Sequence, residues 1–204
     1  MLVYIEFIRR QPGVPLEGFH AIVNRGQTGW AGDYAEDVLL FNIGRTFRLG
    51  PEPEYMAVWY TPEGGLERIG EWERVFGSGT AADFEEPFRV AARIERAGCY
   101  EPLLEPAPGE GGPYYAEFFE PAEGVDRAAV RSFFEERRGR HADLALDLLI
   151  DRIGRLGPDP RGLAIWSAPD FGALDSIARE LDGIEAPIRL VDAGIYRDLG
   201  RETI

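Results

Sequence analysis

The chain contains no lysine, because all 22 of its basic residues are arginine. Schiff-base chemistry, pyridoxal-phosphate catalysis and P-loop nucleotide hydrolysis each require a lysine side chain. The sequence therefore excludes these three classes of enzyme. The exclusive use of arginine is itself typical of codon bias in a GC-rich genome.

Cysteine and histidine are also scarce. Cys99 is the single cysteine, and the two histidines are His20 and His141. One cysteine cannot form an intrachain disulfide, and two histidines cannot form a three-histidine zinc site. With no Cys/His cluster in the sequence, we expect no metal site and no cofactor.

Long apolar runs and an excess of positive charge are missing as well. No stretch approaches the roughly 18 apolar residues of a membrane span, and the N-terminal MLVYIEFIRR lacks the core of a signal peptide. The net charge of −14 at pH 7 repels nucleic acid and anionic membrane surfaces. We expect a cytoplasmic protein whose partner is a small molecule, with no nucleic acid and no membrane.

The sequence does contain one passage twice. RTFRLGPEPEYMAVWYTPEGG (45–65) aligns without a gap to RIGRLGPDPRGLAIWSAPDFG (152–172). The starts of the two halves also match, VYIEFI (3–8) against YYAEFF (114–119), as do AGCY (97–100) and AGIY (193–196). The chain is therefore interpreted as two copies of one unit, residues 1–106 and 114–204, joined by a linker at 107–113.

Each copy has the pattern of a β-α-β-β-α-β unit, the ferredoxin-like arrangement. In the first copy, strands are predicted at 3–8, 38–49, 55–60 and 99–104, and helices at 15–23, 66–76 and 82–93, with a loop of about ten residues after 23. In the second copy, strands are predicted at 114–120, 144–156, 163–167 and 188–199, and helices at 125–138 and 171–181. The passages Gly50–Pro53 and Gly157–Pro160 are tight turns, since two prolines fix the backbone angle φ and remove amide donors.

A ferredoxin-like sheet leaves one face without helices, and a partly aromatic bare face should pack on something. The predicted fold class is α+β: two tandem ferredoxin-like units whose bare faces meet in an intramolecular barrel with pseudo-twofold symmetry. The alternative is that each copy pairs with a second chain, as in a homodimer.

These residues resemble the dimeric α+β barrel superfamily. The similarity rests on Leu49-Gly50-Pro51 followed by Val58-Trp59 and Glu67-Arg68, and on EPLLEP at 101–106, which look most like NIPSNAP-type proteins. The resemblance implies the barrel fold. It implies little about function, because the superfamily includes cofactor-free oxygenases, isomerases, haem enzymes and proteins of unsettled role.

Strand alternation selects the candidate site residues. Val3, Ile5 and Phe7 form a wholly apolar row, which we expect to lie under the helices. Tyr4 and Glu6 share the other face, which should point into the barrel interior. The same rule places Glu117 on that inner face, together with the aromatic ligand-binding candidates Trp59, Tyr115 and Trp166.

Glu6 and Glu117 are the catalytic candidates, because a carboxylate on an interior strand face is costly to bury and a raised pKa would suit a general base. The competing interpretation is structural, with Arg45 or Arg48 pairing with Glu6, and Arg152 or Arg155 with Glu117. Arg45 and Arg152 are also candidates for ligand binding. Trp59 and Trp166 are equally compatible with ordinary core packing.

Two functions follow from this pattern. The first is a small-molecule-binding protein whose apolar or aromatic ligand lies between the two sheets. The alternative is a cofactor-independent monooxygenase or isomerase, in which Glu6 or Glu117 moves protons and an arginine stabilises the developing negative charge.

Overall fold

A computed structural model describes residues 1–33, 37–46, 54–78, 82–108, 111–181 and 186–200. The described chain divides into two compact units. Unit 1 comprises Met1–Gly44, Pro53–Cys99 and Leu199–Ile204, and unit 2 comprises Arg45–Glu52 and Tyr100–Asp198. The predicted turn at Gly50–Pro53 and the candidate partner Arg48 lie outside the described residues.

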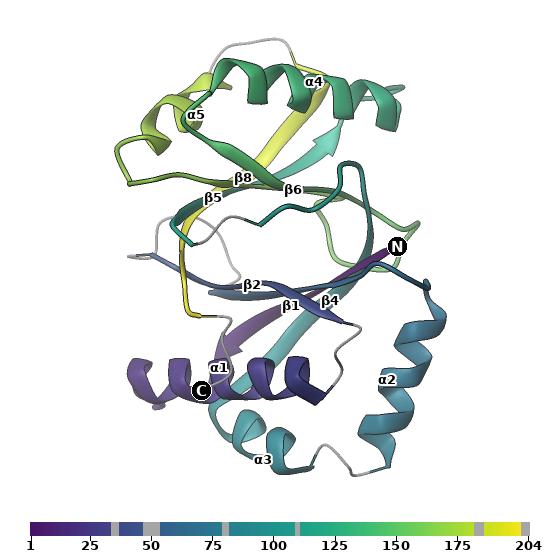
Figure 1. Ribbon diagram of the computed structural model, residues 1–204, viewed down its shortest axis with the longest axis vertical. Coiled ribbons are helices and arrows are strands. Elements are labelled where there is room, and N and C mark those ends of the chain that lie inside the picture. Colours follow the sequence, from purple (N-terminus) through teal and green to yellow (C-terminus); the bar gives the residue numbers. More distant parts are fainter. Residues whose placement is uncertain (34–36, 47–53, 79–81, 109–110, 182–185, 201–204) are drawn as a thin grey trace. The chain divides into compact units, whose positions relative to one another are not determined.

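The sheet of unit 1 has the strand order β4-β1-β3-β2 (Figure 1). Its strands are β1 (Leu2–Arg10), β2 (Val38–Arg45), β3 (Tyr55–Thr61) and β4 (Ala92–Pro102), and the last three residues of β4 belong to unit 2. Strand β3 pairs antiparallel with both β1 and β2, so the predicted hairpin is confirmed. Strand β4 begins at Ala92, earlier than the sequence pattern indicates.

Three helices accompany this sheet: α1 (Leu16–Asp33), α2 (Glu67–Gly77) and α3 (Ala82–Ala91). The prediction that the first helix ends near Val23 is wrong, since α1 continues through Gly26, Gly29 and Gly32. Glycine disfavours a helix by only about 1 kcal/mol per residue, and packing of the apolar side of α1 on the sheet can outweigh that cost. Phe19 and Val23 of α1 are fully buried in the unit 1 core.

The sheet of unit 2 has the strand order β8-β5-β7-β6. Its strands are β5 (Pro113–Pro121), β6 (Ala145–Arg152), β7 (Gly162–Ser167) and β8 (Ile188–Asp198). Helices α4 (Arg127–Arg140) and α5 (Leu174–Glu180) lie on one face of it (Figure 1). The hairpin around Gly157–Pro160 joins β6 to β7 as predicted.

Within each unit, the strand register pairs residues in the same way. The pairs of unit 1 correspond to those of unit 2. Tyr4 lies opposite Trp59 and Glu6 opposite Ala57 in unit 1. Tyr115 lies opposite Trp166 and Glu117 opposite Ala164 in unit 2. A register shift also occurs at matching places, between Leu39 and Phe41 in β2 and between Leu146 and Leu148 in β6.

The predicted orientation of the strands is wrong. Tyr4, Ala57 and Trp59 pack with Phe19, Val23 and Trp72 of the helices. Tyr115, Ala164 and Trp166 likewise pack with Val130 and Phe134 of α4. The Tyr/Glu/Trp rows therefore lie under the helices. Val3, Ile5, Ala116 and Phe118, on the other face, are buried as well. Because both faces are buried, alternation alone could not tell which of them the helices cover.

Gly162 at the start of β7 is required by a close approach of the Phe119 ring. A Cβ atom at this position would overlap the ring edge, and Phe119 is itself buried against Phe134, with ring centroids 5.1 Å apart. We predict that Gly162→Ala lowers the free energy of unfolding by about 1–3 kcal/mol, the usual range for overpacking. Chemical denaturation measures this difference.

Gly139→Ala is the matched control, because an added methyl at this position in α4 meets no neighbouring atom. It should leave stability unchanged or raise it by up to about 1 kcal/mol. Equal effects of the two substitutions would show that the Phe119 contact does not constrain residue 162.

Candidate functional site

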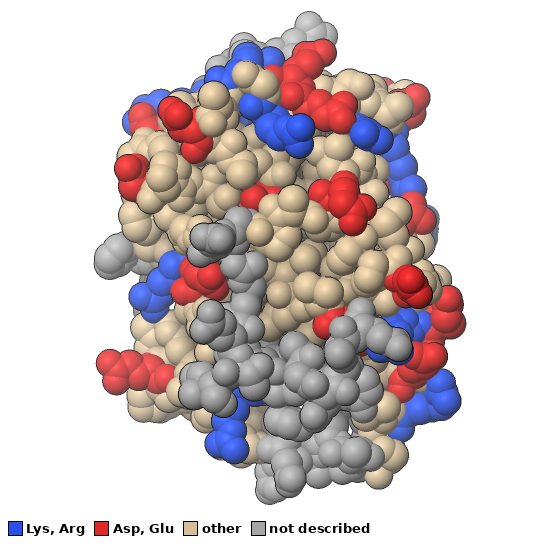
Figure 2. Space-filling view, in the orientation of Figure 1, with Lys and Arg blue, Asp and Glu red and all other residues tan. Residues whose placement is uncertain are grey.

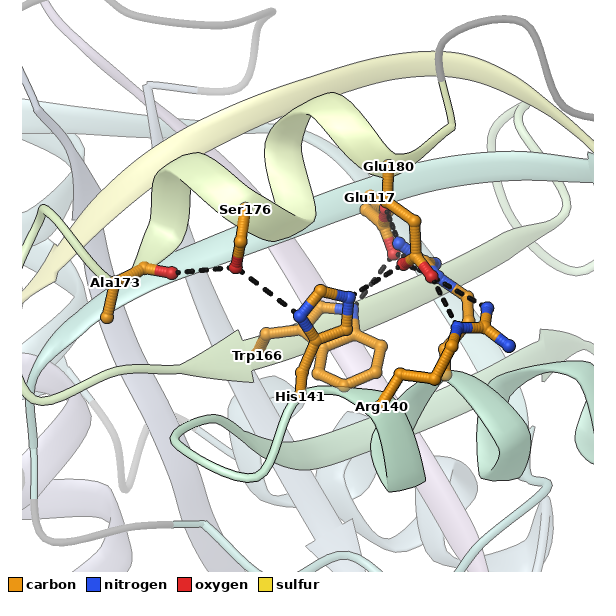
Figure 3. A network of polar contacts seen from close by, with 8 residues as sticks. Glu117, Arg140, His141, Trp166, Ala173, Ser176 and Glu180 are labelled. Carbon is orange, nitrogen blue, oxygen red and sulfur yellow. Dashed lines mark hydrogen bonds and ion pairs between the residues drawn. The ribbon is translucent and has the colours of Figure 1, made fainter.

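Glu117 of β5 is the sequence-predicted site residue with the most complete set of contacts. Its side chain, labelled in Figure 3, is fully buried, and both carboxylate oxygens accept hydrogen bonds from Arg137 of α4, at 2.8 and 2.9 Å. The indole Nε1 of Trp166 donates a further bond of 2.9 Å to Oε2. The expected burial and pairing of Glu117 are therefore confirmed.

The expected arginine partner of Glu117 is wrong. Arg152 ends β6 on the opposite face of the sheet and binds Asp159 at 2.7 Å and the carbonyl oxygen of Gly157 at 3.1 Å. Arg155 is exposed in the turn that follows. The partner comes instead from the helix that covers the Glu117 face.

Arg137 is placed by the periodicity of α4. Val130, Phe134 and Arg137 are the buried residues of this helix, and their spacing of four and three puts them on one side of it. The guanidinium carbon of Arg137 lies 5.3 Å from the ring centroids of both Phe134 and Trp166. An arginine on the apolar stripe of a predicted helix was the signal that could have identified this residue.

Glu180 at the end of α5 connects this pair to the surface. Its Oε2 accepts from Arg137 Nε at 2.8 Å and lies 2.9 Å from His141 Nε2, and its Oε1 accepts from Arg140 at 2.6 and 2.9 Å. Burial alone would raise the pKa of Glu180. The hydrogen bonds from Arg137, Arg140 and His141 outweigh burial and lower its pKa from 4.5 to about 2.

His141 forms the C-cap of α4, as its position after a basic helix end predicts. Its Nδ1 lies 3.3 Å from the hydroxyl oxygen of Ser176, which also lies 3.3 Å from the carbonyl oxygen of Ala173. Ser176, His141 and Glu180 are the residue types of a Ser-His-acid catalytic triad, in which serine is the nucleophile and histidine the base. However, Glu180 is already bound by two arginines, and the single hydroxyl proton of Ser176 can be donated to only one of its two neighbours. These contacts are those of a structural network.

The Glu117 row of unit 2 is therefore closed to a substrate. Every polar atom of the Glu117 carboxylate faces Arg137 or Trp166, and neither Glu117 nor Arg137 is exposed to solvent. Burial alone would lower the pKa of Arg137, but its bonds to Glu117 and Glu180 raise it, so the guanidinium stays charged. The arrangement favours the structural interpretation of Glu117.

The equivalent row of unit 1 is more open. Tyr4 and Glu6 are both partly exposed, whereas Tyr115 and Glu117 are buried. Tyr4 packs against Trp72 of α2, with ring centroids 5.2 Å apart, and Trp59 is buried beside it. Burial raises the pKa of Tyr4, and the negative charge of Glu6 raises it further, so the phenol keeps its proton.

The other candidates lie elsewhere. Arg45, at the end of β2, is partly buried, and its pairing with Glu6 stays a prediction. His20 of α1 lies 2.8 Å from the hydroxyl of Tyr55. Cys99 is a buried free thiol, and burial raises its pKa.

Sequence reasoning missed the buried carboxylate of unit 1, Asp37, which precedes β2. It accepts hydrogen bonds from Trp72 Nε1 at 2.8 Å, Thr61 at 3.0 Å and Arg68 at 3.1 and 3.2 Å. Unit 1 thus also has a carboxylate bound by an arginine and a tryptophan, but at a different position from Glu117. In the part of the chain that the structure describes, no group of His, Cys, Asp and Glu is placed to hold a metal ion.

We predict that Glu117→Gln lowers the free energy of unfolding by about 3–5 kcal/mol, because Arg137 would lose its buried counter-charge. Glu135→Gln on the exposed side of α4 is the matched control. Its partner Arg131 lies 3.1 Å away on the surface, so its loss should cost less than about 1 kcal/mol. Urea denaturation measures the free energy of unfolding of both variants. Equal decreases in the two variants would contradict the prediction that the buried pair contributes more than the surface pair.

The lowered pKa of Glu180 predicts a specific acid sensitivity. A carboxyl whose folded-state pKa lies below its unfolded-state value stabilises the fold above the unfolded pKa. That stability, about 1–2 kcal/mol with solvent screening taken into account, should be lost as the pH falls from about 4.5 towards 2. Glu180→Gln should therefore flatten the pH dependence of unfolding in this window, as measured by denaturation at a series of pH values. Exposed Glu123→Gln should leave the profile unchanged.

No family model matches this chain, and no curated protein matches it. Solved structures do match it. A haem-binding protein from Thermus thermophilus is 12% identical, with a TM-score of 0.60 and coverage of 97% of this chain and 91% of the other. A protein of Lactobacillus acidophilus NCFM assigned as a monooxygenase is 11% identical, with a TM-score of 0.60 and coverage of 98% and 94%.

A mutant chlorite dismutase from Candidatus Nitrospira defluvii, in complex with cyanide, is 11% identical, with a TM-score of 0.55 and coverage of 97% and 91%. At these identities the similarity concerns the fold and leaves the activity open. Nearly the whole length of the chain therefore has the α+β fold of the chlorite dismutase-like proteins.

Proposed function

We propose that this chain binds a small aromatic or apolar molecule at the helix-covered face of unit 1, around Tyr4, Glu6 and Trp59. The single observation that carries this proposal is the difference between the two units. Solvent reaches Tyr4 and Glu6, whereas the equivalent Tyr115 and Glu117 are sealed by α4. The expected ligand position moves accordingly from the bare sheet face to the face under the helices.

We propose that this difference arose after a tandem duplication of one ferredoxin-like unit. Matching strand orders, registers and register shifts support a common origin. When Tyr4 is aligned with Tyr115, the core residues Phe19 and Val23 align with Val130 and Phe134, and Gly26 aligns with Arg137. The first copy thus has a glycine at the helix position from which the second copy binds its glutamate. The NIPSNAP-type relationship and the pseudo-twofold barrel belong to the same proposal.

Haem does not fit the helix-covered face of unit 2. A haem needs a flat open space and an axial ligand, but Phe134, Arg137 and Trp166 fill this face and are fully buried. Both ring nitrogens of His141 lie within 3.3 Å of Glu180 or Ser176 oxygens. His20 of unit 1 directs its Nε2 at Tyr55. No step of the proposal therefore involves haem.

The chemistry of the unit 1 face defines the ligand. The partly exposed ring of Tyr4, which packs on the buried Trp72, provides aromatic surface, and the protonated Tyr4 hydroxyl is a hydrogen-bond donor. Glu6 provides a carboxylate that accepts hydrogen bonds. The site should therefore prefer an aromatic molecule with a cationic or donor group over the same ring with an anionic group.

The alternative is a cofactor-independent monooxygenase or isomerase in which Glu6 accepts a proton from the substrate. The partial exposure of Glu6 beside a protonated Tyr4 favours this alternative over one that uses Glu117. In that case Glu6→Gln would abolish turnover while leaving ligand binding within a few fold.

We predict that tryptamine binds most tightly, indole less tightly and indole-3-acetate most weakly. These three probes share one ring system and differ in charge. Ligand-observed NMR measures the three dissociation constants. Glu6→Gln should raise the dissociation constant of tryptamine about tenfold, the loss expected for one charge-assisted hydrogen bond. It should leave the dissociation constant of indole nearly unchanged. Exposed Glu63→Gln is the control with the same change of charge in the same unit.

A failure of all three probes to bind the folded protein would contradict the proposed site. Binding that neither Glu6→Gln nor Tyr4→Phe changes would place the ligand elsewhere. Circular dichroism establishes that each variant is folded.

A further inference from the structure

A cleft of about 450 Å³ opens in unit 1 where β1 ends and the chain turns into α1. It is lined by the turn Gln11–Pro15 together with Arg9, Arg10, Glu54 and Arg93. Its volume lies within the usual range of small-molecule sites. The cleft contains none of the Tyr4, Glu6 and Trp59 side chains proposed above, so it would be a second, independent site.

The cleft concentrates positive charge in an acidic protein. Three of its lining residues are arginines, in a chain with a net charge of −14. Acidic and basic side chains are interspersed over the face drawn in Figure 2. The cleft differs in that three arginines line it and Glu54 is its single acidic lining residue among those described. Such a site attracts a small anion, while the charge of the whole chain disfavours a polyanion.

Arg10 and Arg93 line the cleft and each donates only one hydrogen bond among the described residues. Arg10 donates one bond of 2.7 Å to the carbonyl oxygen of Val14, and Arg93 donates one of 2.6 Å to Glu95. A guanidinium carries five N–H donors, so most donors of both groups are unused by the described residues around them. Arg9 also binds Glu95, at 3.1 Å, which holds two of the arginines on one carboxylate next to the cleft.

Glu54 adds a negative charge to the lining of the cleft. It is the acidic residue among the lining residues and precedes β3. An anion that binds the arginines would be repelled by Glu54 unless the same molecule also offers it a hydrogen-bond donor. The combination therefore selects a ligand that carries a carboxylate together with a hydroxyl or amino group.

We propose that this cleft binds a small hydroxy- or amino-carboxylate, with the carboxylate held by Arg10 and Arg93 and the donor group directed to Glu54. The carboxylate binds through charge-assisted hydrogen bonds, which arginine can form in a bidentate manner. The donor group distinguishes the ligand from phosphate and from simple carboxylates.

Isothermal titration calorimetry with L-malate, succinate and inorganic phosphate on the whole chain at low ionic strength tests this proposal. Malate should bind at least about tenfold more tightly than succinate, which differs by one hydroxyl, and more tightly than phosphate. Arg93→Gln should weaken malate about tenfold or more. Glu54→Gln should remove the preference for malate over succinate. Salt at about 0.3 M should weaken the binding of all three.

Arg131→Gln is the matched control, because Arg131 is as exposed as Arg93 and also pairs with a surface glutamate. Arg93→Gln decides the test, since Arg10 also holds Val14 and its loss could disturb the turn. Absence of saturable malate binding to the wild-type protein would overturn the proposal. So would malate binding that Arg93→Gln and Arg131→Gln affect equally, or phosphate binding as tight as that of malate.

Discussion

The ion pair between Glu117 and Arg137 is the interaction on which the organisation of unit 2 depends. An isolated charge is very costly to bury, whereas a bidentate pair with its remaining hydrogen bonds satisfied can be accommodated. The pair joins β5 to α4, Trp166 adds a bond from β7, and Glu180 extends the network to α5. One carboxylate on a central strand thereby belongs to a network that links β5 and β7 to both helices, beside the apolar contacts between them.

The same constraint explains why the two units differ. In unit 2 the helix supplies an arginine, so the glutamate can be fully buried. In unit 1 the corresponding Glu6 is partly exposed, and the buried carboxylate is Asp37, bound by Arg68 and Trp72. Each unit thus buries a carboxylate together with an arginine and a tryptophan, but the carboxylate lies within β5 in unit 2 and just before β2 in unit 1. A buried pair stabilises a scaffold, whereas a partly exposed carboxylate can interact with a ligand.

Structures with this fold include a haem-binding protein, a chlorite dismutase and a protein assigned as a monooxygenase. Function in such a fold is determined by the few side chains that remain accessible. In this chain the helix-covered face of unit 2 is occupied by its own side chains. The accessible polar groups of unit 1 are Glu6 with Tyr4 and the arginines of the cleft, and both proposed sites are built from them.

The sequence by itself determined the strands, most of the helices and the placement of the Tyr and Trp positions on one face of each sheet. These follow from local periodicity and from the repeated passage, which are independent of tertiary contacts. It also selected Glu117 as unusual, since a carboxylate amid apolar strand residues must be paired. The end of α1 could not be placed, because packing outweighs the local effect of glycine. The start of β4 at Ala92 was also missed.

Only the tertiary structure decided which face of each sheet the helices cover. Alternation divides a strand into two rows of side chains, but when both rows are buried it gives no sign of what covers each one. The partner of Glu117 was undetermined for the same reason. Arg152 belongs to the repeated passage but lies on the wrong face, whereas Arg137 reaches the carboxylate because α4 packs directly over it.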